Sequence, residues 1–278
     1  LVGSNFDDSF ITKIGESNII DGGIQGIKGD TLDYSTNGAT SIVLDLDVTH
    51  TTDVYGIGVT NDGTYASVLV NGNSSAMDKI KNIENIKGSA GADTIYGNAD
   101  NNTIFGMGGA DTIYGEAGDD IIHMQSVANS LGNFVDGGAG FDTVSYDGLD
   151  ERVVINMQGV TNVAVQVGNT TNHHIITSIE NIIGTAQNDT ITGSEGVNTF
   201  VGMDGSDTIY GIGGNNIIYG GTKERNSTST AADTIYGGTG DDTIYGAAGA
   251  DDLRGGLGDD TIYGGAGNDI IKGGSGSD

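Results

Sequence analysis

The sequence predicts an all-β protein built as a flattened parallel solenoid, in which two nine-residue repeats form one coil. Three observations predict this fold. Glycine accounts for 50 of the 278 residues, proline and cysteine are absent, and a glycine-led repeat with Asp or Asn at its sixth position recurs every nine residues. Disordered glycine-rich chains usually carry proline and lack regularly spaced apolar residues. The recurrent isoleucines of this chain therefore favour an ordered fold.

A single repeat such as GGTGDDTIY, residues 237–245, divides into a six-residue turn and a three-residue strand. Glycine at the first, second and fourth positions permits crowded backbone and lets carbonyl groups point inward. Alternation along the strand points the eighth residue inward and its two neighbours outward. A strand this short turns back at once, so two repeats make one coil. The eighth positions are Ile191, Phe200, Ile209, Ile218, Ile235, Ile244, Leu253, Ile262 and Ile271.

Five segments follow one another along the chain. Residues 1–23 contain fragments of the repeat and are expected to end an upstream array. Residues 24–87 and 146–183 are expected to be β-rich inserts that cap the arrays, because SIVLDLDV, ASVLV, RVVINM and VAVQV alternate apolar and polar residues. The arrays themselves occupy residues 88–145 and 184–278, and the second stops within a repeat. We therefore expect about two copies of one module, cut from a longer protein.

Each array is entered through the sequence IENI, which contains Glu84 in the first module and Glu180 in the second. We predict that these two segments are strands that cover the exposed first coil of an array. The side chains expected to be buried there are Ile83, Ile86, Ile179 and Ile182.

Two further features belong to the second array. The polar stretch KERNSTST, residues 223–230, stretches one repeat and is predicted to be a surface loop. Tyr219, Tyr245 and Tyr263 hold the ninth position of alternate repeats and should stack along one outer face. Such a stack is either an aromatic ladder that stabilises the sheet or a platform for a carbohydrate.

The acidic residues carry the chemical signal of this sequence. Asp and Glu number 38 against ten Lys and Arg, and the net charge of −28 excludes nucleic acid and anionic membrane as partners. Stacked coils set successive sixth-position aspartates about 5 Å apart. A like-charge pair at that distance costs roughly 1 kcal/mol in water and about 3 kcal/mol at a surface-like dielectric. A hard cation between coils reverses this cost, because carboxylates and carbonyls suit calcium. We therefore predict that these aspartates are calcium ligands.

The repeats GGTGDDTIY, GGLGDDTIY and GGAGNDIIK resemble the repeats-in-toxin (RTX) family, also called hemolysin-type calcium-binding repeats, with the pattern G-G-x-G-x-D-x-apolar-x. The resemblance covers roughly half of the chain. It implies a parallel β-roll with several calcium ions as cofactors, bound between the turns on both edges. It also implies a bacterial protein that is exported by the type I secretion machinery and folds outside the cell.

Carried over to this chain, the resemblance implies a column of ligands along each edge of an array. The aspartate ligands would be Asp93, Asp111, Asp120, Asp142, Asp189, Asp207, Asp233, Asp242, Asp251, Asp260, Asp269 and Asp278. The carbonyl ligands would include those of Gly106, Gly108, Gly115, Gly202, Gly237, Thr239, Gly246, Ala248, Gly255, Leu257, Gly264 and Ala266. Asparagine keeps a ligand oxygen but loses the charge. Weak or vacant sites are therefore expected at Asn102, Asn133, Asn198 and Asn216.

The sequence contains none of four motifs common in enzymes: G-x-S-x-G, the P-loop, the dinucleotide-binding fingerprint and H-E-x-x-H. We therefore expect no enzyme activity from this region. No apolar run approaches membrane-spanning length. The expected function is a calcium-folded structural or extender region of a large secreted or cell-surface protein, an adhesin or a surface-layer-like protein. The alternative is a calcium-dependent carbohydrate-binding or secretion module of an extracellular enzyme or toxin. The inserts would then bind a surface glycan or a host ligand.

Overall fold

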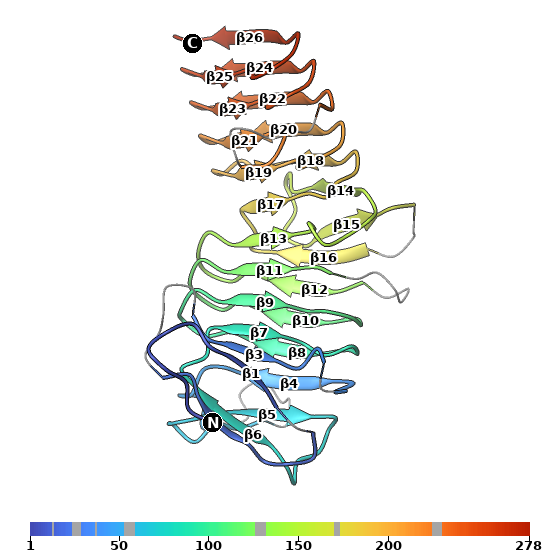
Figure 1. Ribbon diagram of the computed structural model, residues 1–278. Helices are drawn as coiled ribbons and strands as arrows, with labels where there is room; N and C mark the ends of the chain where they lie inside the picture. The colour runs from blue at the N-terminus through green and yellow to red at the C-terminus, as the bar shows by residue number, and fades with distance from the viewer. Residues whose placement is uncertain are drawn as a thin grey trace. The chain divides into compact units, whose positions relative to one another are not determined.

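The computed structural model describes residues 1–12, 14–23, 29–36, 38–52, 59–125, 132–169, 173–223 and 230–278. Most of the predicted surface loop at 223–230 lies outside these residues. The chain divides into two compact units, an N-terminal unit from Leu1 to Asp142 and a C-terminal unit from Thr143 to Asp278. Both are built from β-strands that stack as rungs (Figure 1). No helix in the described part of the chain is long and apolar enough to cross a membrane.

The N-terminal unit contains two sheets of mostly parallel strands. One sheet runs in the order β1 (Ser9–Ile11), β3 (Thr31–Asp33), β7 (Asn85–Lys87), β9 (Thr103–Phe105) and β11 (Ile121–His123). The other runs in the order β2 (Ile19–Asp21), β6 (Asp78–Lys81), β5 (Ala66–Val70), β4 (Ile42–Asp45), β8 (Thr94–Tyr96), β10 (Thr112–Tyr114) and β12 (Phe134–Asp136).

The C-terminal unit repeats this arrangement. One sheet runs in the order β13 (Thr143–Ser145), β17 (Asn181–Ile183), β19 (Thr199–Val201), β21 (Ile217–Tyr219), β23 (Thr243–Tyr245) and β25 (Thr261–Tyr263). The other runs in the order β16 (His173–Thr177), β15 (Val163–Val167), β14 (Val153–Asn156), β18 (Thr190–Thr192), β20 (Thr208–Ile212), β22 (Thr234–Thr239), β24 (Asp252–Leu257) and β26 (Ile270–Ser275).

Within the arrays, the parallel pairing joins every second repeat. Ile191 in β18 pairs with Ile209 in β20, eighteen residues further on, while the intervening repeat forms β19 in the opposite sheet. Stretched repeats keep the register, since Ile209 pairs with Ile235 across the longer connection. The predicted two-repeat coil and the all-β parallel solenoid are therefore confirmed.

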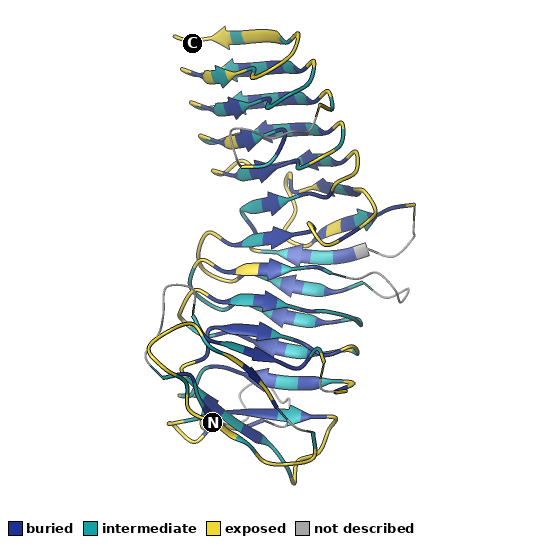
Figure 2. Ribbon diagram, viewed as in Figure 1, coloured by how far each residue is buried: buried dark blue, intermediate teal, exposed yellow. Residues whose placement is uncertain are grey.

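One apolar side chain per strand forms the core. The eighth-position residues from Ile191 to Leu253 have no exposed surface, whereas the strand residues beside them are partly exposed, except Val201 (Figure 2). Ile262 and Ile271 are the exceptions: Ile271 lies in the last rung of its sheet and is 49% exposed. The predicted inward and outward alternation is confirmed for the covered coils.

The inserts form three-stranded antiparallel meanders. In the N-terminal unit β4, β5 and β6 are antiparallel neighbours, and β4 also pairs in parallel with β8. In the C-terminal unit β14, β15 and β16 are connected in the same way, with β14 parallel to β18. The first strand of each meander, β4 or β14, therefore serves as a rung on which the following array is built.

The IENI strands lie against the first coil of each array, as predicted, but they do not end the stack. Strand β7 pairs with β3 on one side and β9 on the other, and β17 lies between β13 and β19 in the same manner. Both are internal rungs, because each has a parallel neighbour on either side. The expected burial is nevertheless found, with exposed fractions of 9% or less for Ile83, Ile86, Ile179 and Ile182.

Aromatic rings stack along the outer faces of the rungs. The ring centroids of Tyr219 and Tyr245 lie 4.8 Å apart, and those of Tyr245 and Tyr263 lie 4.9 Å apart, with nearly parallel planes. A second stack on the opposite sheet joins Tyr210 to Tyr236 at 4.9 Å. The predicted stack of Tyr219, Tyr245 and Tyr263 is confirmed, and its geometry fits a ladder that stabilises parallel strands.

Candidate metal sites

Sixth-position side chains line the turns as columns, joined by hydrogen bonds to the backbone. The N–H of Asp189 donates to Oδ1 of Asp207 at 2.8 Å, and the N–H of Asp207 donates to Oδ1 of Asp233 at 2.8 Å. The column continues in the same way through Asp251 to Asp269. Each side chain therefore uses one oxygen to bind the preceding coil.

The remaining columns have the same construction. On the other edge of the C-terminal unit the bonds run through Asn198, Asn216, Asp242, Asp260 and Asp278. In the N-terminal unit they run through Asp93, Asp111 and Asn133, and through Asn102, Asp120 and Asp142. The structure thus stacks the sixth-position residues in the columns expected from the sequence.

The second carboxylate oxygen of several column aspartates is buried without a hydrogen-bond partner among the described residues. These residues are Asp111, Asp120, Asp207, Asp242, Asp251 and Asp260. A buried carboxylate oxygen without a donor is costly, and a cation that approaches it removes the cost. The orphaned oxygens therefore fit a metal ion.

The first glycine of a repeat shapes the space beside this oxygen. A Cβ added at Gly246 would lie 2.6 Å from Oδ2 of Asp251 and 2.6 Å from the carbonyl oxygen of Gly264 in the next coil. Two oxygens therefore converge on the bare Cα, and we call this arrangement an oxygen cradle. Gly202, Gly220, Gly237 and Gly255 border cradles of the same composition.

Five of the predicted carbonyl ligands lie in such a cradle, because each belongs to the first glycine of the next coil: Gly106, Gly202, Gly246, Gly255 and Gly264. The carbonyls of Gly115 and Gly237 lie instead beside the side chains of Asn102 and Asn216. The carbonyl oxygens of Leu257 and Ala266 accept backbone hydrogen bonds from the N–H groups of Gly240 and Gly249, both at 2.8 Å. Gly108, Thr239 and Ala248 hold the matching third positions of their turns. The first-glycine carbonyls are thus the donors that the structure places with the aspartates.

Burial strongly shifts the acidity of these columns. It raises the pKa of Asp111 and of Asp207 to about 8, and that of Asp120 and of Asp233 to about 7. The pKa of Asp242 rises to about 6 for the same reason. A neighbouring column aspartate adds to the shift in each of these cases. The charged form therefore needs a compensating cation at neutral pH.

The donors in each cradle are oxygens alone, which selects a hard cation such as calcium. Within the described ranges, no three carboxylate or histidine side chains converge on one point. Backbone carbonyls must therefore complete any coordination shell.

Residues 87–122, 177–209, 192–222, 227–262 and 248–278 match the RTX calcium-binding nonapeptide repeat family, described as 4 copies of the repeat. The arrays of this chain belong to that family. RTX repeats bind calcium, which agrees with the oxygen-only cradles. No curated protein matches the chain.

Three asparagines of the RTX columns donate from their amide nitrogen to backbone carbonyls. Nδ2 of Asn216 donates to the turn carbonyls of Gly213 and Gly214 at 3.1 and 3.2 Å. Asn102 and Asn198 donate to the carbonyls of Glu84 and Glu180 at 3.1 and 2.8 Å. Beside Gly211 the amide nitrogen of Asn216 takes the place of the second aspartate oxygen. Asn102 and Asn198 keep Oδ1 at the equivalent place, where it accepts a backbone N–H at 3.0 Å. Weak or vacant sites at these asparagines stay a prediction.

In the first RTX repeat of each array, the second carboxylate oxygen of the aspartate accepts a hydrogen bond from its own turn. Oδ2 of Asp93 accepts the N–H of Ser89 at 2.7 Å, and Oδ2 of Asp189 accepts the N–H of Thr185 at 2.6 Å. The sequence signal for this difference is a Ser or Thr in place of the second glycine. Asp93 and Asp189 stay predicted ligands, but their carboxylates already have donors.

Sequence reasoning also missed a second ladder at the fifth position of the repeats. Oδ1 of Asp241 accepts the N–H of Asp259 at 2.8 Å, and Oδ1 of Asn215 accepts the N–H of Asp241 at 3.0 Å. The recurrent Asp or Asn immediately before the sixth position is its signal. These exposed side chains bridge coils without lying in the cradles.

Replacing Asn216 by Asp should create an additional calcium site. The substitution removes the amide that bonds Gly213 and Gly214 and places a second charged oxygen beside the turn. We expect one more calcium ion per chain and lower stability in chelator, because the carbonyls lose their protein donor. Native mass spectrometry counts the ions. Asn215→Asp is the matched control and should leave that number unchanged, since Asn215 lies in the exposed ladder.

The calcium-free state should gain order as the pH falls. The folded pKa values of about 6 to 8 exceed the unfolded value of about 4. The folded columns therefore bind more protons than the unfolded chain does. The stability that these protons give the folded state is fully present below pH 4 and is lost as the pH rises to about 8. Circular dichroism in chelator should show more β-structure at pH 5 than at pH 8. With calcium the trend should reverse, because protons compete with the ion. Parallel trends in both buffers would contradict the prediction.

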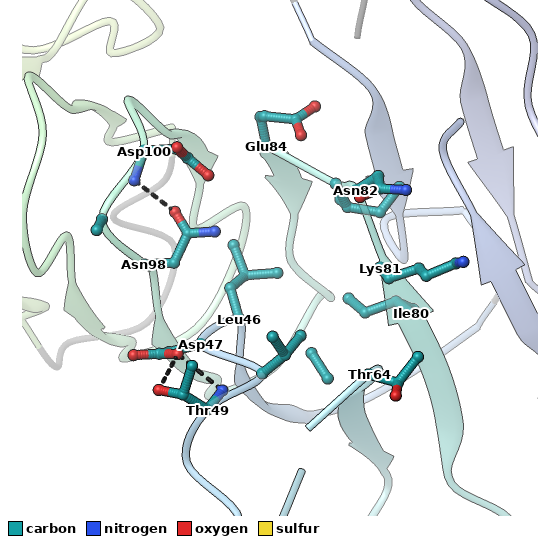
Figure 3. A pocket seen from close by; sticks show the side chains of 14 residues that line it. Leu46, Asp47, Thr49, Thr64, Ile80, Lys81, Asn82, Glu84, Asn98 and Asp100 are labelled. Carbon is teal, nitrogen blue, oxygen red and sulfur yellow. Dashed lines mark hydrogen bonds between the residues drawn. The ribbon is translucent and has the colours of Figure 1, made fainter. Parts of the chain in front are cut away.

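A hollow recurs beside the insert of each unit. In the N-terminal unit it encloses about 430 Å³ between the insert and the link from β6 to β7 (Figure 3). The C-terminal unit has a hollow of about 310 Å³ at the equivalent place. Corresponding lining residues are Leu46 and Met157, Ile80 and Ile176, Ile83 and Ile179, Glu84 and Glu180, and Asn98 and Ser194. Both hollows are therefore lined by apolar and polar residues together.

Proposed function

We propose that this chain is a structural region of a large exported protein whose RTX arrays fold when they bind calcium. The observation that carries the proposal is the set of buried, orphaned carboxylate oxygens at the turns. Those of Asp120, Asp207, Asp242, Asp251 and Asp260 lie beside a glycine carbonyl of the next coil. Calcium bound there would couple successive coils and supply free energy that one buried aliphatic side chain per repeat provides only in part.

The difference in calcium concentration between the inside and the outside of the cell would determine where the chain folds. Low calcium inside the cell would keep the chain unfolded for type I secretion, and calcium outside would fold it. An adhesin or a surface-layer-like protein is the proposed parent, because an array and an insert recur as a module with one topology. The role proposed for this region is structural rather than catalytic, in keeping with the structural character of RTX repeats.

Calcium titration tests this function. Isothermal calorimetry should show binding at about 10⁻⁴–10⁻³ M, the range of extracellular calcium modules, together with a gain of β-structure by circular dichroism. Magnesium at the same concentration is the control, since it prefers octahedral geometry and retains its waters. Absence of calcium binding up to about 10 mM would overturn the proposal, given that range.

A second candidate function is calcium-dependent carbohydrate binding by the inserts. The recurrence of one hollow at equivalent positions of both units supports it, because a concave site that mixes apolar and polar residues can hold a small ligand. A glycan array probed with and without calcium tests this candidate. Binding that requires calcium would support it, and no binding under either condition would remove it.

A further inference from the structure

Asp30 lies outside the residues that match the RTX family, yet its surroundings are those of an array aspartate. The residue has no exposed surface, and its Oδ1 accepts the N–H of Asp8 at 2.8 Å. Its Oδ2 is buried without a hydrogen-bond partner in the described part of the chain. Asp7, Asp8 and Asp21 lie close enough to raise its pKa by repulsion, in addition to burial. A cation bound at this carboxylate would therefore be stabilising, as at the array aspartates.

A second oxygen meets Asp30 at Gly22. A Cβ added at Gly22 would collide with Oδ2 of Asp30 and with the carbonyl oxygen of Asn82. The N–H of Gly22 donates to the carbonyl of Lys81 at 3.0 Å, which holds the two segments together. Oδ2 of Asp30 and the carbonyl oxygen of Asn82, which lie more than fifty residues apart in the sequence, thus converge on the Cα of Gly22. The array cradles have the same arrangement.

The link from β6 to β7 makes this site different from an array cradle. Asn82 has a left-handed backbone with φ of 53° and donates from Nδ2 to Oδ1 of Asp21 at 2.8 Å. Only three residues separate the two strands, and Glu84 takes the register position of a repeat aspartate. Its longer side chain reaches Asp30, whose N–H donates to Oε2 at 2.8 Å. The carbonyl of the site therefore comes from the insert (Asn82 is labelled in Figure 3).

We propose that Asp30 and the carbonyl of Asn82 bind a calcium ion that fastens the end of the β4–β6 meander to the segment that leads into β3. Oxygen-only donors with a single carboxylate suit a hard divalent cation, and water completes its shell. This inference rests on the proposed function, and it adds a role: calcium orders the insert as well as the arrays.

The test compares Asp30→Asn with Asp33→Asn in the full chain. Asparagine keeps the oxygen that accepts the Asp8 N–H and loses the charge at the cradle. The carboxylate of Asp33 already has partners, with Oδ1 bound by the N–H of Ser35 at 2.8 Å and Oδ2 3.6 Å from Nζ of Lys87. Native mass spectrometry in calcium should find one ion fewer for Asp30→Asn and an unchanged number for Asp33→Asn.

Hydrogen exchange of residues 78–87 provides the second measurement. In calcium, protection of this segment should fall at least tenfold in Asp30→Asn and stay unchanged in Asp33→Asn. Gly22→Ala, which fills the cradle and leaves Asp30 intact, should also lose one ion. A wild-type number of ions in both Asp30→Asn and Gly22→Ala would overturn the inference while leaving the proposed function intact. A wild-type chain that binds no calcium would instead remove the proposed function itself.

Discussion

Removal of calcium at neutral pH is expected to unfold most of the chain. The columns hold buried carboxylates whose charges repel one another, and four of those in the C-terminal unit, Asp207, Asp242, Asp251 and Asp260, have an orphaned oxygen. At a calcium concentration 100 times the dissociation constant, each independent site contributes about 2.7 kcal/mol. Four sites would contribute about 11 kcal/mol, comparable to the whole stability of an ordinary domain.

Far-ultraviolet circular dichroism checks this prediction. The β-structure signal should disappear in chelator and return when excess calcium is added, while magnesium should not restore it. The melting temperature in calcium should rise with calcium concentration, because the ion binds only the folded chain. A chain that keeps its spectrum and melting temperature in chelator would contradict a role for the ion in holding the coils together.

Filling one cradle is expected to have the second largest effect. Gly246→Ala would place a Cβ 2.6 Å from Oδ2 of Asp251, 2.6 Å from the Gly264 carbonyl oxygen and 3.1 Å from Cδ1 of Leu253. Gly246 does not have a positive φ, so alanine suits its backbone and the effect arises from the occupied space. Loss of one ion at about 2.7 kcal/mol and overpacking at about 1–3 kcal/mol give a loss of roughly 4–6 kcal/mol in calcium.

Urea unfolding in saturating calcium measures this loss, and native mass spectrometry counts the ions. The matched control is Gly196→Ala in the same unit, where an added Cβ would meet only Oγ of Ser194 at 3.5 Å. The control should keep the wild-type number of ions and nearly the wild-type midpoint. Equal midpoints for the two variants would show that the cradle does not hold the ion.

The arrays were predictable because every constraint in them is local. A strand of three residues presents one side chain to the core, and a nine-residue period brings equivalent residues into register at every second repeat. The columns from Asp189 to Asp269 and from Asn198 to Asp278 follow from that period once residues 223–230 are treated as a loop. The ligand roles of these residues stay predictions that the calcium experiments address.

The differences among the columns were not predictable from the sixth position itself. Asp93 and Asp189 are satisfied by Ser89 and Thr185, and Asn216 by its own turn, whereas Asp207 keeps an orphaned oxygen. These outcomes depend on which neighbouring group is a donor, so they require the positions of atoms on adjacent coils.

The sequence by itself determined the two-repeat coil, the buried eighth position and the alignment of the acids, because short-range periodicity decides which side of the chain each residue occupies. Only the tertiary structure decided that the IENI strands are internal rungs and that Asp30 meets Asn82. Those pairings join segments separated by an insert, and the strand alternation is equally satisfied by either placement. Long-range packing and the length of the turn at Glu84 decide between the two placements. A local sequence pattern contains neither kind of information.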